Sequence, residues 1–285
     1  MQGRVVVITG ATSGIGQVAA ERLAALGARV LFIARDHTRG RSMLERLRRA
    51  GPGAAHEVRY ADLSSIGETT RVAREIRGAV DRIDVLINNA GAVFGSRRLS
   101  ADGLEMTFAL NHMAYFVLTA ELEPRLRTST PARIVNTASA AHVGVTLNFD
   151  DLQYANGYRG YRAYRRSKLC NILYTRELAR RLAGTGVTAN CLHPGFVATR
   201  FGDEAGGAIQ RALKILKLRA ISPEQGADTI VYLASSPEVA KQSGLYFYKC
   251  RVVEPSPAAQ DDRAATRLWD ESARLAARPT HEAAR

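Results

Sequence analysis

Short apolar runs alternate with longer amphipathic stretches along most of the chain. The first run, residues 4–9 (RVVVIT), is β-branched and almost wholly apolar, which is typical of a strand buried on both faces. Comparable runs predict further strands at residues 28–34, 57–60, 83–87, 133–137, 187–192 and 244–248. Because helical patterns separate these strands, we expect an α/β fold, with a doubly wound parallel sheet of Rossmann type in a three-layer α/β/α sandwich.

Helical periodicity and turn residues mark the segments between the strands. The predicted helices cover residues 14–26, 37–50, 65–80, 104–126, 163–182, 208–218 and 223–235. No internal repeat or long linker divides the chain, so we expect residues 1–285 to form a single domain, with residues 255–285 as a C-terminal helical tail. Leu268, Trp269 and Leu275 would dock a helix over residues 261–277 onto the rest of the protein.

The composition is that of a globular protein with an unusual charge balance. Of the 285 residues 46% are hydrophobic, and 40 Lys+Arg against 27 Asp+Glu give a net charge of +13. The arginines are scattered over many helices, which indicates a solvated basic surface and no nucleic-acid partner. Cys170, Cys191 and Cys250 form no CxxC or Cys/His pattern, so we expect neither a metal site nor a disulfide framework.

The chain is also expected to lack segments that enter or cross a membrane. A first strand that begins at Arg4 leaves no room for a signal peptide. No run approaches the ~20 apolar residues of a transmembrane segment. These observations, together with the cysteine usage, predict a cytoplasmic protein.

A glycine-rich turn connects the first strand to the first helix. It contains Gly10, Ser13, Gly14, Ile15 and Gly16. Glycine allows positive φ and lets the backbone approach a pyrophosphate, whose charge then meets the N-terminus of the helix. A turn of this kind between a strand and a helix predicts a dinucleotide site.

Tyr164 and Lys168 are four residues apart in a predicted helix and therefore share one face. An ammonium beside the phenol would lower the tyrosine pKa from about 10 toward neutral pH, which suits a group that donates and accepts protons. Tyr154, Tyr158 and Tyr161 lie nearby, but only Tyr164 has a lysine at this spacing. The pair therefore predicts a general acid/base.

Ser139 follows the carboxyl end of the predicted strand at residues 133–137. Sites in parallel sheets lie beyond the carboxyl ends of the strands. Ser129 and Thr137 are alternatives for the same role, but the position just beyond the strand end favours Ser139. Its hydroxyl would hydrogen-bond a substrate oxygen on which charge develops in the transition state.

Taken together, these motifs resemble the short-chain dehydrogenase/reductase family in its single-domain form, over roughly residues 4–250. The family's other motifs match Asn88–Gly91 (NNAG) after the fourth strand, Asn111 in the long helix, and residues 194–199 (PGFVAT) after the sixth strand. Residues 34–36, 141–142, 244–247 and 254–257 are similar to the retinol dehydrogenase-like branch.

The resemblance implies a set of site residues. The catalytic residues would be Asn111, Ser139, Tyr164 and Lys168, with Asn111 holding a water that links Lys168 to bulk solvent. Cofactor contacts would come from Gly10, Ser13, Gly14, Ile15, Gly16, Arg35, Asp62, Leu63, Asn89, Ala90, Gly91, Tyr164, Lys168, Pro194, Gly195, Val197 and Thr199. The resemblance also implies a homodimer or homotetramer built through the helices that carry Asn111 and Tyr164, although the long C-terminal tail could cover that surface instead.

The end of the second strand bears on the choice between NADP(H) and NAD(H). An acidic residue there would bind the ribose 2′-hydroxyl of NAD, but the matching position is Ala34. Arg35 follows and can pair with a 2′-phosphate, which favours NADP(H). Asp36 leaves NAD(H) open, because a shift of one residue would make it the ribose acceptor.

The predicted function is that of an NADP(H)-dependent oxidoreductase that interconverts an alcohol and an apolar carbonyl. The alternative is a non-catalytic NADP(H)-binding regulatory protein. The amphipathic basic segment 208–218 could be a lid over the site or a membrane-surface contact, whereas His193 is expected to serve packing. Candidate substrate contacts are His142, Val143, Phe149, Tyr158, Tyr161 and Phe196.

Overall fold

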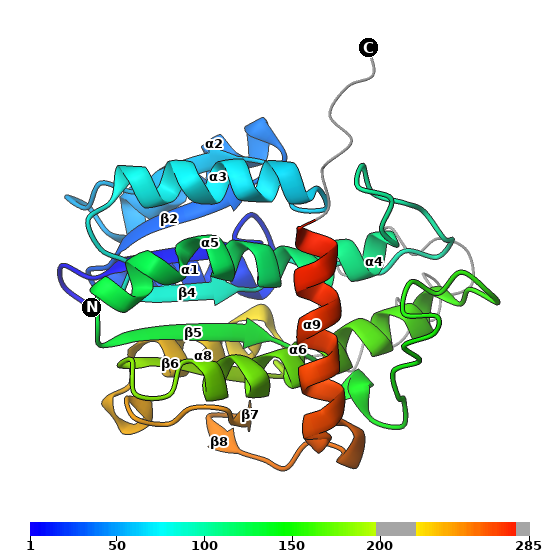
Figure 1. Cartoon of the computed structure of the whole chain (residues 1–285). Helices are drawn as coiled ribbons and strands as arrows, with labels where there is room; N and C mark the ends of the chain where they lie inside the picture. The colour runs from blue at the N-terminus through cyan, green and yellow to red at the C-terminus, as the bar shows by residue number, and fades with distance from the viewer. Residues whose placement is uncertain (198–220, 278–285) are drawn as a thin grey trace.

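Eight strands form one sheet at the centre of the molecule (Figure 1). The computed structural model describes residues 1–197 and 221–277, and all eight strands lie in these ranges. Their order across the sheet is β3-β2-β1-β4-β5-β6-β7-β8, and every neighbouring pair is parallel except β7 and β8. The strands are β1 (Val5–Thr9), β2 (Arg29–Ala34), β3 (Glu57–Tyr60), β4 (Val85–Asn88), β5 (Ala132–Thr137), β6 (Val187–Leu192), β7 (Tyr246–Tyr248) and β8 (Arg251–Val252).

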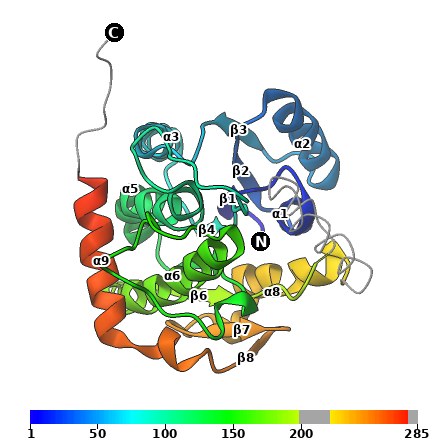
Figure 2. The same ribbon diagram turned by 90° about the vertical axis from the view of Figure 1, so that its right-hand side faces the viewer.

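Helices cover both faces of this sheet (Figure 2). One face carries α1 (Gly14–Ala25), α2 (His37–Ala50) and α8 (Pro223–Ser235), and the other carries α3 (Ile66–Ala79), α5 (Ala114–Thr128) and α6 (Gly160–Arg181). Two apolar cores lie between the layers, one on each side. This confirms the predicted doubly wound, Rossmann-type α/β/α sandwich. Right-handed crossovers place helices on both faces of a parallel sheet when the strand order reverses.

The long helix predicted over residues 104–126 is interrupted in the structure. It divides into a short α4 (Met106–Phe108), a π-helical turn at Ala109–Met113, and α5. The amphipathic pattern did not reveal this break, because one wide turn shifts the helical face by a single residue. Asn111 lies within the π turn. The predicted segment 208–218 lies outside the described residues.

A further helix, α9 (Asp262–Ala276), lies across α6 on the outer side of the molecule (Figures 1 and 2). Leu268 is fully buried. The Trp269 ring packs 5.0 Å from Phe116 of α5 and 5.8 Å from Tyr174 of α6, measured between ring centroids. These contacts agree with the docking residues expected for this segment.

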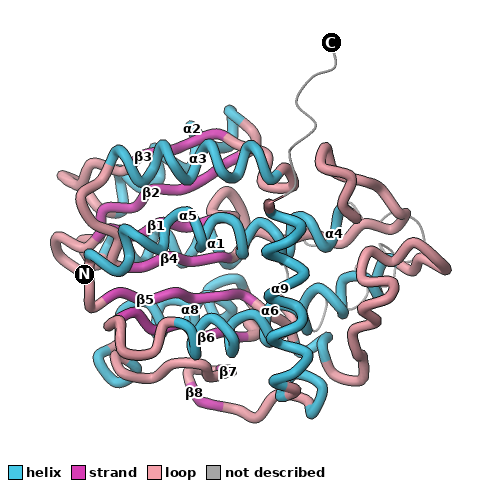
Figure 3. Tube along the Cα trace, in the orientation of Figure 1, coloured by secondary structure: helices cyan, strands magenta, loops and turns pink. Residues whose placement is uncertain are grey.

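Long connections gather at the edge of the sheet where the parallel strands end, on the right of Figure 3. Residues 89–105 follow β4, and residues 138–159 follow β5. Ligands of doubly wound sheets bind beyond the carboxyl ends of the strands, where the strand order reverses. Here the order reverses between β1 and β4, so this edge is where a site is expected.

Candidate active site

The glycine-rich turn follows β1 and has the backbone geometry that the sequence predicts. Gly10 and Gly14 have φ of +69° and +57°, which residues with side chains rarely adopt. Gly16 has ordinary helical geometry, but a Cβ there would collide with the Gly10 carbonyl and the Asn89 amide. The Ser13 side chain makes no capping bond to α1, so the N–H groups of the first turn can face a phosphate.

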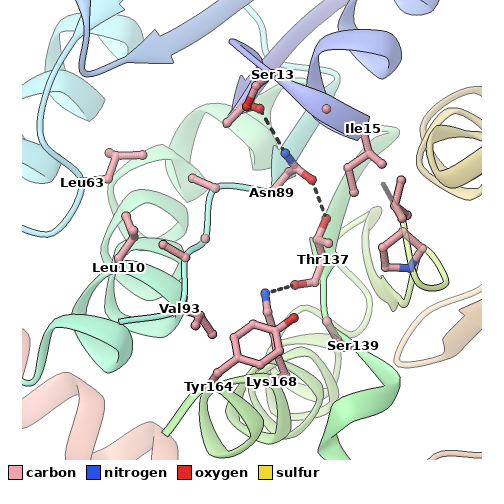
Figure 4. Close-up of a pocket in the computed structure, with 18 of the residues that line it drawn as sticks. Ser13, Ile15, Leu63, Asn89, Val93, Leu110, Thr137, Ser139, Tyr164 and Lys168 are labelled. Carbon is pink, nitrogen blue, oxygen red and sulfur yellow. Dashed lines mark hydrogen bonds between the residues drawn. The ribbon is translucent and has the colours of Figure 1, made fainter. Parts of the chain in front are cut away.

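Three strand ends are tied together beneath this turn. The Thr9 hydroxyl accepts from the backbone N–H groups of Asn89 (2.9 Å) and Ala90 (3.0 Å). The Asn89 amide donates to the carbonyls of Thr9 and Gly10 and accepts from the Thr137 hydroxyl at 3.2 Å (Figure 4). The ends of β1, β4 and β5 are therefore held in fixed relation around the pocket.

The catalytic candidates on α6 lie across the pocket from the turn (Figure 4). Tyr164 and Lys168 are 7% and 3% exposed, so both polar groups are largely withdrawn from water. Lys168 Nζ donates to the Thr137 carbonyl at 2.8 Å and lies 5.8 Å from the Tyr164 ring centroid. The Ser139 side chain lies close enough to the Tyr164 hydroxyl to influence its pKa.

The electrostatics of this pair differ from the sequence-based expectation. Burial raises the pKa of Tyr164 to about 12, although the nearby Ser139 side chain acts in the opposite direction. Burial also lowers the pKa of Lys168 to about 7, so its charge is only partly present at neutral pH. The predicted lowering of the tyrosine pKa is therefore wrong for this structure, because desolvation outweighs the lowering effect of Ser139.

Asn111 lies behind the pocket wall and does not line the cavity. Its amide accepts from Ala92 N–H (2.9 Å) and donates to the Ala92 carbonyl and the Ser167 hydroxyl, both at 3.0 Å. A Cβ on Gly91 would lie 3.1 Å from Asn111 Oδ1 and 3.6 Å from Lys168 Nζ. Gly91 therefore allows the chain after β4 to pass directly over these two side chains.

The opposite end of the pocket is formed where β2 meets α2. Ala34, Arg35, Asp36 and Arg39 line it. The Asp36 carboxylate accepts from Arg39 N–H at 2.8 Å and thereby caps α2, and this bond lowers the pKa of Asp36. The Asp36 carboxylate is thus engaged by the helix. The Arg35 side chain is exposed and lines the margin of the pocket.

These features enclose one cavity of about 910 Å³. Of the predicted cofactor residues, Gly16 lies under the turn, Thr199 lies outside the described residues, and all the others line the cavity. Lining residues that the sequence analysis did not assign include Thr137, Val93, Phe94, Leu110 and Tyr248. Thr137 was considered only as an alternative to Ser139, and the others lie on loops or faces without a sequence signal.

The predicted substrate contacts divide into two groups. Tyr161 and Phe196 line the cavity and are 46% and 40% exposed. The four other candidates do not line it. His142 turns inward, the Tyr158 hydroxyl donates to the Phe94 carbonyl, Phe149 lies beneath Arg267, and Val143 is exposed on the surface.

His193 also borders the cavity. Its ring stacks on Tyr248 at 4.0 Å, and its Nδ1 accepts from Gly195 N–H at 3.2 Å. Burial lowers the pKa of His193 to about 4, so the ring is neutral at pH 7. These contacts are those of a packing residue that shapes the wall.

Two kinds of feature are absent from residues 1–197 and 221–277. No helix there is long and apolar enough to cross a lipid bilayer. The same ranges contain no group of three or more His, Cys, Asp or Glu side chains placed to hold a metal ion.

Known proteins share both the sequence and the fold. The family model described as short chain dehydrogenase matches residues 4–208. Human retinol dehydrogenase 14 is 41% identical over 95% of this chain and 85% of its own length. Among solved structures, an uncharacterised protein of Mycobacterium paratuberculosis is 31% identical, with a TM-score of 0.77 over 99% of this chain and 96% of its own.

A second solved structure, the RhlG/NADP complex of Pseudomonas aeruginosa, is 30% identical, with a TM-score of 0.69 over 87% of this chain and 94% of its own. The matched regions include the glycine-rich turn and the Tyr164/Lys168 pair. We conclude that the chain belongs to the short-chain dehydrogenase/reductase family, in its retinol dehydrogenase-like branch, and is an oxidoreductase of alcohol and carbonyl groups that uses a nicotinamide cofactor.

Proposed function

We propose that the protein is an NADP(H)-dependent oxidoreductase that interconverts an apolar alcohol and its carbonyl, with Tyr164 as general acid/base. The observation that carries this proposal is the buried Tyr164 side chain, which lies close to Ser139 and Lys168 on the wall of a cavity that begins at the glycine-rich turn. The bound nicotinamide would supply or accept the hydride.

The proton chemistry belongs to the protein side chains. With a pKa of about 12, Tyr164 holds its proton at neutral pH, and can donate it to a carbonyl oxygen that becomes an alkoxide. Ser139 would hydrogen-bond the same oxygen as its charge develops. Lys168, held by the Thr137 carbonyl, can return a proton to the phenolate, and Asn111 would order the water that supplies Lys168.

The preference for NADP(H) is supported by the end of β2. The Asp36 carboxylate caps α2, and the positively charged Arg35 and Arg39 both line this end of the cavity, which favours a 2′-phosphate. Arg35→Ala should weaken NADPH binding about 10- to 100-fold and leave NADH binding unchanged, since hydrogen bonds to charged groups contribute this much. The control is Arg41→Ala, a change at an exposed arginine of α2 that does not line the cavity. Preferred NADH binding with a silent Arg35→Ala would move the ribose contact to Asp36.

The substrate class follows from the apolar part of the cavity. Its lining residues there are Val93, Phe94, Leu110, Tyr161, Phe196 and Tyr248. Walls of this kind favour apolar ligands with few polar groups. The names of the retinol dehydrogenase relatives support a long apolar alcohol or aldehyde of retinoid or lipid type. A cytoplasmic location, a single domain and a homo-oligomer stay predictions.

The catalytic assignment is tested by Tyr164→Phe with Tyr161→Phe as the matched control. Both tyrosines come from α6 and line the cavity, with ring centroids 6.3 Å apart. Loss of a general acid/base should reduce kcat with retinal or decanal at least about 100-fold in Tyr164→Phe, while Tyr161→Phe changes it by a few fold. Near-full turnover by Tyr164→Phe would refute the assignment.

A further inference from the structure

The turn that carries Ser139 is held by residues outside the cavity. Ser139 precedes a short 3-10 helix, Ala140–His142, and its hydroxyl oxygen accepts from Ala141 N–H at 3.1 Å. Ala140 and Val143 are exposed, so apart from the buried His142 ring, packing contributes little to the position of this turn. Its geometry therefore depends on hydrogen bonds.

The His142 ring makes one hydrogen bond through each of its two nitrogens. Nδ1 lies 2.7 Å from the Ser139 carbonyl, and Nε2 lies 3.1 Å from the backbone nitrogen of Ser256. Since a backbone N–H can only donate, Nε2 must accept, and Nδ1 must carry the proton that is donated to Ser139. The neutral ring satisfies both partners at once.

The surroundings of His142 keep this arrangement in place. The side chain is 2% exposed, and the Tyr246 ring meets it edge-on with centroids 5.3 Å apart. Burial lowers the pKa of His142, so the neutral form persists at pH 7. The ring cannot turn toward the cavity without leaving both hydrogen bonds.

Ser256 belongs to the C-terminal segment, defined here as residues 254–277, which is anchored independently of His142. Ala259 and Leu268 of this segment are fully buried. Farther along, the Ser272 hydroxyl bonds His112 Nε2 at 2.8 Å, and His112 adjoins Asn111 in the π turn. The segment thus makes polar contacts beside two of the four proposed catalytic residues.

We propose that His142 is a positioning residue through which the C-terminal segment fixes the carbonyl, and hence the hydroxyl direction, of Ser139. This inference rests on the proposed role of Ser139. Arg165 of α6 supports the far end of the same turn through the carbonyls of Ala141 (3.0 Å) and Val143. The His142 bond acts at the other end, on the residue that would face the substrate oxygen.

A single substitution can remove the link and leave the side chains of the cavity intact. Ser256→Pro deletes the N–H that His142 accepts, and the Ser256 φ of −57° suits proline. Ser256→Ala is the matched control, because it keeps the N–H and removes only a hydroxyl that has no hydrogen-bond partner in the described part of the chain.

Turnover of decanal with NADPH gives the first test. We expect Ser256→Pro to lower kcat about tenfold while the Kd for NADPH stays within about twofold of wild type, since one positioning hydrogen bond is lost. Ser256→Ala should match wild type. Equal kcat in the two variants, or a parallel loss of NADPH affinity in Ser256→Pro, would overturn the inference.

If Ser256→Pro does not fold, variants of His142 provide a second test of the inference. His142→Asn keeps an amide nitrogen near the Nδ1 position, whereas His142→Leu keeps no polar atom, so kcat should fall in the order wild type, His142→Asn, His142→Leu. Wild-type kcat in His142→Leu would contradict the inference. The proposed function has a separate test. Normal turnover by Tyr164→Phe would refute it, whatever the Ser256 and His142 variants show.

Amide hydrogen exchange gives a readout that needs no substrate. Backbone N–H groups of residues 141–143 should exchange about tenfold faster in Ser256→Pro, or in His142→Leu, than in Ser256→Ala, because the turn opens more often. Unchanged exchange in this turn would count against the positioning role even if no aldehyde is turned over.

Discussion

Gly16→Ala gives a sharp test of the proposed phosphate-binding turn. A Cβ at position 16 would lie 3.0 Å from the carbonyl carbon of Gly10, and closer still to its oxygen and to Asn89 Nδ2. The carbonyl belongs to the backbone, and the Asn89 amide is held by hydrogen bonds to β1 and Thr137, so neither obstacle can rotate away. The start of α1 must therefore move away from the turn.

The size of the effect follows from this geometry. Overpacking in a tightly packed region costs about 1–3 kcal/mol, and contact with two fixed groups places Gly16→Ala near 2–3 kcal/mol of lost unfolding free energy. Displacement of the N–H groups that would bind the pyrophosphate should also weaken NADPH binding about tenfold or more. Urea denaturation and a fluorescence titration with NADPH measure the two quantities.

Gly78→Ala is the matched control. Gly78 lies in α3 and is exposed, and a Cβ there would have no neighbour within 4 Å in the described structure. Alanine in a helix is favoured over glycine, so this variant should gain about 0.5–1 kcal/mol with unchanged NADPH binding. Gly16→Ala with the stability and NADPH affinity of wild type would refute the close packing on which the site description depends.

Three further predictions concern the pocket and the C-terminal segment. The pKa of Lys168 is about 7 in the folded protein and about 10.5 in the unfolded chain. Between these pH values the unfolded chain binds more protons than the folded protein. The free energy of unfolding therefore rises with pH in this range, by at most about 1.4 kcal/mol per pH unit. Lys168→Met should remove this rise in urea unfolding between about pH 7 and about pH 8.5, and an unchanged slope would contradict the burial of its charge. Asp36→Ala should lower the denaturation midpoint through loss of the α2 cap but leave NADH affinity unchanged, whereas a selective loss of NADH binding would assign Asp36 to the ribose. Leu268→Ala should lower the free energy of unfolding by about 2–4 kcal/mol in the same urea assay, because this side chain is fully buried. Arg263→Ala, a change at an exposed residue of α9, should lower it by less than about 0.5 kcal/mol. Equal losses in the two variants would show that α9 is not docked as described.

Sequence periodicity predicted the fold closely where an element follows its pattern without interruption. The bounds of α2, β3, β6 and α8 are those expected, because turn residues or caps mark their ends. The π turn at Ala109–Met113 could not be predicted, since its apolar spacing also fits a regular helix. The short β8 also lacks a periodic signal, as two residues cannot establish one.

The site was predictable where function demands a particular residue type at a particular spacing. The glycines Gly10 and Gly14 and the Tyr164/Lys168 pair line one cavity for this reason. Gly16 does not line the cavity but packs beneath the turn against Gly10 and Asn89. Side chains on the loop after β5 were not predictable, because partners distant in sequence decide their direction. His142 was expected to face the substrate but turns toward Ser256, more than a hundred residues away.

The pKa of Tyr164 was mispredicted for a related reason. Helical spacing brings Lys168 close to Tyr164, but it does not report how deeply either group is buried. Desolvation then determines both shifts, upward for the tyrosine and downward for the lysine.

The proposed function requires that the protein catalyses a redox reaction and does not merely bind a dinucleotide. The most direct test mixes the NADPH-saturated protein with an excess of retinal or decanal and follows the absorbance of the reduced nicotinamide together with the alcohol formed. We expect many equivalents of NADPH to be oxidised and alcohol to accumulate in equal amount. Tight binding of NADPH with no consumption in the presence of either aldehyde or of apolar ketones would contradict it, and would favour a non-catalytic NADP(H)-binding regulatory protein.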